Sequence, residues 1–122
     1  MASGLVAGAI PRRSSNVEYV EIPYENPDEK IEAEKKIADI ATLLAENKEN
    51  FVETARSKGL KARESGPFSQ EEVVSGLAYS KSFHDTAFSL AVGEMSQPFF
   101  TSEEKGFAYV ILKKEDIPSR SL

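Results

Sequence analysis

Few side chains in this sequence could serve as an acid, a base or a nucleophile. His84 is the only histidine, and it lies between Phe83 and Asp85. A catalytic histidine needs an orienting partner. Neighbours on a helix point about 100° apart, so Asp85 is not that partner. We therefore expect His84 to lie on a solvated helix surface.

Carboxylates, serines and glycines add no second candidate. Glu71 with Glu72, and Glu103 with Glu104, are adjacent in sequence, but adjacent side chains face different directions on a helix or strand. The serines lack the glycine-flanked turn of a nucleophile elbow, and the glycines are too scattered for a phosphate loop. With no cysteine and one histidine, we predict no catalytic residue, no metal and no cofactor.

Aromatic residues are more informative, because large rings gather in the second half of the chain. Most of them should be core residues in a protein of 122 residues. A small sheet has one core face, so a partly exposed aromatic pocket is the alternative. The residues concerned are Phe68, Tyr79, Phe83, Phe88, Phe99, Phe100, Phe107 and Tyr109.

Composition indicates one soluble domain and excludes some partners. Apolar residues make up 40% and charged residues 29%, and the net charge is −5. Nucleic-acid binding needs a basic patch, which this charge disfavours. The apolar run Leu5–Ile10 is too short to span a bilayer. We expect no contact with nucleic acid and none with a membrane by this segment.

The pattern along the chain predicts one ordered domain over residues 17–116. Residues 1–16 have the composition of a flexible leader, a tag or a linker, and residues 117–122 should be frayed. A first strand runs from Val17 to Pro23, and Asn26 followed by Pro27 begins a helix. Asn50 and Glu53 form a candidate capping box for a second helix, which ends at Gly59.

The rest of the chain predicts a short strand over residues 60–64, a turn at 65–67 and one helical turn over 69–74. A helix capped by Ser82 and closed by Gly93 follows, and then a hairpin of strands 95–101 and 107–113. The last strand is almost wholly apolar and should be central, with both faces covered. This element order predicts an α+β fold.

Three stretches resemble the parvulin-type prolyl isomerases: 66–69 (GPFS), 83–90 (FHDTAFSL) and 92–98 (VGEMSQP). That family has the motifs G-W-F-S, F-x-x-A-A-F-x-L and G-E-v-S-x-P in this order, before a closing strand. The resemblance covers residues 17–116. It implies a parvulin-like (FKBP-like) fold, in which a four-stranded, mostly antiparallel sheet packs with three to four helices.

The resemblance also implies that catalytic groups of the family have been lost. Family enzymes carry a histidine in the first strand, where Tyr19 or Val20 stands, and another in the last strand, where Val110 stands. A Met/Gln pair that precedes the pocket phenylalanine in many members is replaced by Tyr79 and Ser80. The loop that supplies a cysteine or aspartate is nearly absent. The pocket phenylalanine itself is retained.

This pattern is similar to the non-catalytic parvulin-like modules of multidomain envelope foldases of the SurA and PpiD type. It implies an apolar pocket for unfolded or proline-containing polypeptide, neighbouring foldase domains as partners, and a periplasmic or cell-envelope location. A weakly active prolyl isomerase is one alternative. A structural or dimerising spacer, with a buried Phe83, is another. The expected peptide-binding residues are Phe68, Tyr79, Phe83, Phe88 and Leu90.

Overall fold

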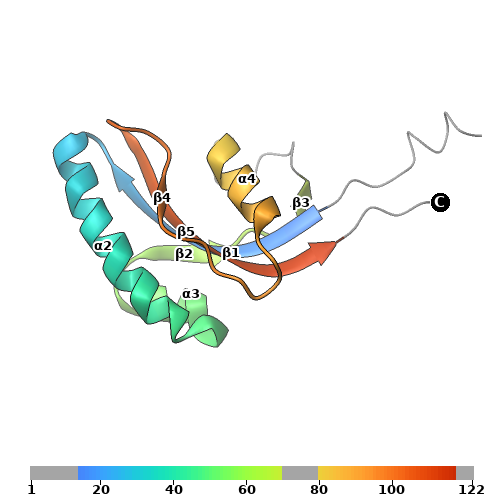
Figure 1. The fold of residues 1–122 in the computed structure, drawn as a ribbon. Coiled ribbons are helices and arrows are strands. Elements are labelled where there is room, and N and C mark those ends of the chain that lie inside the picture. The colour runs from blue at the N-terminus through green and yellow to red at the C-terminus, as the bar shows by residue number, and fades with distance from the viewer. Residues whose placement is uncertain (1–13, 70–79, 118–122) are drawn as a thin grey trace, which may run out of the picture.

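The computed structural model describes residues 14–69 and 80–117 of the chain (Figure 1). Within these residues, strands and helices follow one another as β1 (Ser14–Tyr24), α2 (Pro27–Ala45), the 3-10 helix η1 (Lys48–Asn50), α3 (Phe51–Ser57), β2 (Lys61–Glu64), β3 (Phe68–Ser69), α4 (Lys81–Ser89), β4 (Phe99–Phe100) and β5 (Gly106–Ile117). The expected α+β class is confirmed.

One antiparallel sheet holds the described strands together. Its order is β2-β1-β5-β4, and β3 also pairs with β1. The central strands β1 and β5 run side by side from the pair Ser14↔Ile117 to the pair Tyr24↔Gly106. The resemblance implied four strands. The fifth arises because the chain after β2 returns to β1, where Phe68 pairs with Ser15.

The two faces of the sheet carry separate apolar clusters, because successive strand residues point to opposite faces. Figure 1 shows α4 above the strands and α3 below them. The α2 cluster joins the sheet to α2 and α3 through buried residues that include Val20, Ile37 and Val110. The aromatic cluster joins it to α4 and consists of Val17, Tyr19, Phe68, Phe83, Ala87, Phe88, Tyr109 and Ile111. As predicted, the last strand is therefore central and covered on both faces.

Helix α2 begins as its sequence predicts. The Asn26 side chain accepts a hydrogen bond from the Glu29 amide (2.8 Å), and Pro27 occupies the first turn. One of the otherwise unpaired amides of the helix end thus gains a partner. Within the helix, residues spaced by three and four turn toward the sheet. These are Ala33, Ile37, Ile40 and Leu44.

Two predicted helix caps are wrong. Asn50 precedes α3, but its side chain makes no capping hydrogen bond. It has φ −121° and ψ 36° after the 3-10 turn, rather than the extended backbone typical of an N-cap. The cap of α4 is Ser80, whose hydroxyl accepts from the Phe83 amide (3.3 Å), and not Ser82. This helix ends at Ser89, before the turn that holds Gly93.

Two strand boundaries also differ from the prediction. β1 begins at Ser14 rather than Val17, because a bulge between Asn16 and Val17 lets the strand continue along β5. The strand expected over residues 95–101 is reduced to Phe99–Phe100 and one bridge between Met95 and Leu112. Pro98, just before β4, has no amide to contribute to the ladder.

Candidate functional site

The centre of the aromatic cluster is Phe83, which the resemblance identified as the retained pocket phenylalanine. Its ring centroid lies 5.1 Å from that of Tyr109 and 5.3 Å from that of Tyr19, and both contacts are edge-to-face. Such geometry is favourable for aromatic pairs. Phe83 is only 1% exposed. In this structure it is therefore a core residue between α4 and the sheet.

The structure brings together most of the predicted peptide-binding residues. Phe68 lies 5.6 Å from Phe88 and 6.2 Å from Phe83, between ring centroids. Leu90 is partly buried against the same cluster. Tyr79 lies outside the described residues. Phe68 and Phe88 are buried, as Phe83 is, so these rings present no open shelf, and their role in peptide binding stays a prediction.

His84 does not lie on a solvated surface, which corrects the expectation from sequence. It is 1% exposed, and its ring packs edge-to-face against Phe68 at 5.2 Å. Its Nδ1 lies 2.8 Å from the Ser80 carbonyl oxygen, which can only accept, so Nδ1 carries the hydrogen. Phe83 and His84 are both buried because a broad stripe of α4 faces the sheet. This stripe consists of Phe83, His84, Ala87 and Phe88.

A buried lysine holds the last turn of α4. Lys113 is 1% exposed, and its Nζ donates to the Ala87 carbonyl oxygen (2.7 Å). The same Nζ lies 5.4 Å from the Phe88 ring centroid. The Ser15 hydroxyl also donates to the Ala87 carbonyl (3.4 Å). A cation near the C-terminus of a helix is favourable, so these contacts fix α4 on β1 and β5.

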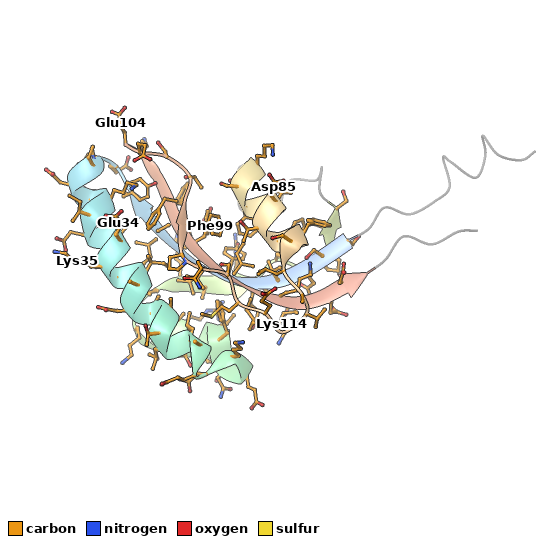
Figure 2. All side chains as sticks on the ribbon, viewed as in Figure 1. Glu34, Lys35, Asp85, Phe99, Glu104 and Lys114 are labelled. Carbon is orange, nitrogen blue, oxygen red and sulfur yellow. The ribbon has the colours of Figure 1, made fainter. Side chains whose placement is uncertain are left out.

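Two further rings carry the aromatic cluster toward the surface. Phe99 is half-buried, with its centroid 5.6 Å from that of Tyr109, and Phe107 is 37% exposed at 6.0 Å from the same ring. Figure 2 shows Phe99 on the side of the sheet that carries α4. We call Phe99, Phe107 and Tyr109 the aromatic platform. Its exposed part is Phe107 with the half-buried Phe99, and both rings pack against Tyr109, which is only 3% exposed.

Polar groups border the platform, and they are bonded to one another. The Tyr109 hydroxyl donates to Glu21 Oε2 (3.0 Å), and Arg63 Nε donates to the Tyr19 hydroxyl (2.8 Å). Burial, and then the Glu21 carboxylate, raise the pKa of Tyr109 well above its ordinary value. Tyr109 is therefore a neutral hydrogen-bond donor across the physiological pH range.

The sequence contains signals for these residues that the prediction did not use. Tyr19 and Glu21 are two apart in a strand, as are Phe107 and Tyr109, so each pair shares a face. Tyr19 lies beside Tyr109 only because β1 pairs with β5, and these strands are far apart in sequence. Arg63 reaches Tyr19 because β2 pairs with β1 in the register Tyr19↔Arg63.

The chemistry available here is recognition of apolar and aromatic groups, with a polar rim. Within residues 14–69 and 80–117, no three His, Asp or Glu side chains are grouped as a metal site would require. None of the helices in this described part has the length and apolar character needed to cross a membrane. The site thus consists of rings, two engaged hydroxyls, a carboxylate and a guanidinium.

The fold agrees with a family comparison. A family model described as the rotamase, PPIC-type PPIase domain, matches residues 20–116. The chain belongs to this family of parvulin-type domains, as its motifs indicated. Searches of curated proteins and of solved structures found no match. Val110, where the resemblance implied one lost histidine, pairs inside the α2 cluster with Val20, on the face away from α4. Tyr19, the alternative to Val20 for the other lost histidine, belongs to the aromatic cluster.

Proposed function

We propose that this chain is a parvulin-like module of a protein foldase that binds unfolded or proline-containing polypeptide and has weak prolyl isomerase activity or none. The observation that carries the proposal is the aromatic platform, where Phe107 is 37% exposed beside the half-buried Phe99. Under this proposal the client contacts these outer rings, and Phe68, Phe83, Phe88 and Leu90 support them from beneath. A periplasmic or cell-envelope location and neighbouring foldase domains belong to the same proposal.

Binding of apolar segments is favoured because the platform is already ordered. Tyr109 is held from behind by Phe83 and Tyr19. A proline ring or an aromatic side chain that covers Phe107 removes apolar surface from water, which contributes roughly 25 cal/mol per Å². The client must become ordered, which opposes this gain. We expect weak binding, as suits a module that must release its clients.

Strong catalysis is disfavoured because the polar groups near the platform already have hydrogen-bond partners within the protein. Rotation of the peptide bond has a barrier of about 18–20 kcal/mol. A catalyst must stabilise the twisted bond with groups aimed at it. Near the platform, the Tyr109 and Tyr19 hydroxyls already interact with Glu21 and Arg63. His84 is buried against Phe68 and bonded to the Ser80 carbonyl oxygen.

The test is an NMR titration of labelled protein with the peptide Ala-Phe-Pro-Ala, with exchange spectra recorded on the cis and trans peptide signals. Shifts at Phe99, Phe107 and Tyr109 without faster exchange are expected. Phe107→Ala should weaken binding at least about fivefold, as for a central contact residue. Val92→Ala is the matched control, because Val92 is an apolar residue 61% exposed outside both clusters.

Faster cis–trans exchange would instead establish a weakly active isomerase. An absence of shifts at the platform, or an equal effect of both variants, would contradict peptide binding there. A structural or dimerising spacer is the second candidate, and the burial of Phe83 favours it, since a spacer needs no open pocket. Sedimentation velocity distinguishes this case, because a dimerising spacer self-associates without any peptide.

A further inference from the structure

A cavity of about 390 Å³ lies at the β2 edge of the sheet, next to the aromatic cluster. Helix α3, the residues before β2, β2 itself and β1 contribute its walls. Tyr19 belongs both to this cavity and to the aromatic cluster, so the two regions are continuous. The lining residues are Tyr19, Glu21, Arg56, Leu60, Lys61, Ala62 and Arg63.

The cavity is positively charged in a protein whose net charge is −5. Three exposed cationic side chains line it, Arg56, Lys61 and Arg63. The single carboxylate in the lining is that of Glu21, which already accepts a hydrogen bond from Tyr109. The local charge is thus opposite in sign to that of the whole chain.

Two of the three cations have no carboxylate partner within residues 14–69 and 80–117, although the chain is rich in acids. Neither Arg56 nor Lys61 forms an ion pair with any residue of the described ranges, whereas Lys30, Lys35 and Lys81 each do. Arg56 is held in place, because its Nε donates to the Ala62 carbonyl oxygen (2.9 Å). Arg63 is oriented by its hydrogen bond to Tyr19. Their guanidinium groups suit carboxylate oxygens.

We infer that this cavity binds acidic side chains of the client, so that the module selects polypeptides with Asp or Glu close to the proline or aromatic residue on the platform. The inference deepens the proposed function and rests on it. Charge complementarity identifies the occupant: an acidic segment is attracted to the cavity and a basic segment is repelled from it.

The distance between the platform and the cavity determines how far the acidic residue of the client lies, in its sequence, from the residue on the platform. Ring centroids are 6.0 Å apart from Phe107 to Tyr109, and 6.2 Å apart from Tyr109 to Tyr19 at the cavity wall. This path corresponds to no more than about four residues of extended chain. The acidic residues are therefore expected about three or four positions from the residue on the platform.

Three peptides test the inference. Each has Ala-Phe-Pro-Ala at its centre, and the positions three and four residues from Phe-Pro on both sides hold Glu, Gln or Lys. The Glu peptide should bind most tightly and the Lys peptide most weakly. The difference should shrink when salt is raised from about 0.05 to about 0.5 M, since exposed charges are then screened.

Lys61→Gln, with Lys36→Gln as the control, assigns the effect to the cavity. Both lysines are exposed, but Lys36 lies on α2 and outside this cavity. Lys61→Gln should weaken binding of the Glu peptide about two- to fivefold, as for a surface ion pair, and leave the Gln peptide unchanged. Lys36→Gln should change neither. Thermal unfolding of each variant checks that the fold is intact.

The outcomes distinguish a failure of the acidic preference from a failure of the proposed peptide binding. Equal dissociation constants for the three peptides, or equal effects of both lysine variants, would overturn the acidic preference while peptide binding stands. If none of the three peptides binds, the proposed function and the inference both fall.

Discussion

Glu18 is a half-buried carboxylate with few polar contacts to replace its lost hydration. Its Oε1 accepts no hydrogen bond from the described residues, and Lys114 Nζ is 3.9 Å away. Burial raises the pKa of Glu18, Lys114 opposes this shift, and Glu64, its cross-strand neighbour, adds to it. A carboxyl pKa that is higher in the folded state means that folding favours the protonated carboxyl. The protein therefore loses stability as pH rises through that pKa.

Glu18→Gln should therefore raise the free energy of unfolding at pH 7, because the neutral amide carries no desolvated charge. The gain should decrease as pH falls and vanish below the unfolded carboxyl pKa of about 4.3, where the wild-type side chain is also neutral. Urea unfolding across pH 3–8 measures this difference. Glu49→Gln, at an exposed position of η1, is the control and should show little change. A gain independent of pH would contradict the explanation.

Lys113 should contribute far more to the free energy of unfolding than its neighbour Lys114. Lys113→Ala removes the hydrogen bond to the Ala87 carbonyl and the packing against Phe88. We expect a loss of about 2–4 kcal/mol, from a charged hydrogen bond and a buried aliphatic chain. Lys114→Ala, at a side chain 40% exposed, should cost less than about 1 kcal/mol. Urea unfolding compares them, and similar losses would show that Lys113 does not anchor α4.

Residue types alone could not predict that Lys113 is buried and Glu18 half-buried. Glu and Lys are almost never fully buried, and His84 was expected on the surface because its neighbour Asp85 could not orient it. Each is buried because a partner distant in sequence covers it, as Ala87 does for Lys113 at 26 positions. The expectation that most aromatic residues form the core was easier to make, because large rings are usually buried, and Phe68, Phe83 and Phe88 follow it.

Two asparagines at helix starts offer a direct comparison at the scale of elements. Asn26 caps α2 through its side chain, and Asn50 precedes α3 without such a bond. Asn26→Ala should destabilise the protein by about 1 kcal/mol. Asn50→Ala should change stability by less than about 0.5 kcal/mol. Thermal unfolding of the two variants gives the difference, and equal losses would mean that Asn50 caps α3 in solution.

Elements with a local signal could be predicted, and those that depend on pairing could not. Helix α2 follows from its cap, its Pro27 and its apolar spacing. The short β4 does not follow from its sequence, because Phe99 and Phe100 are limited by Pro98 before them and by the hairpin register. The aromatic platform shares this limit. Its rings meet only after β4 and β5 have paired.

The whole molecule should unfold as one unit, because the α2 cluster and the aromatic cluster share β1 and β5. Leu44→Ala, in the α2 cluster, should cost about 2–5 kcal/mol. It should lower the urea midpoint equally in far-UV circular dichroism, which reports helices, and in near-UV circular dichroism, which reports mainly the aromatic cluster. A near-UV signal that persists after the helices unfold would contradict a shared core.

The pairing of β1 with β5 also affects how the protein reaches its fold. Val20 and Val110 lie opposite each other on adjacent strands although 90 positions separate them, because every other helix and strand of the described chain comes between β1 and β5. During synthesis, β1 has only short partners until the ribosome has released β5. Neither core face can close before then. The nascent domain thus stays open to chaperones and proteases until β5 has been synthesised, and refolding is expected on the slow timescale of structures dominated by distant contacts.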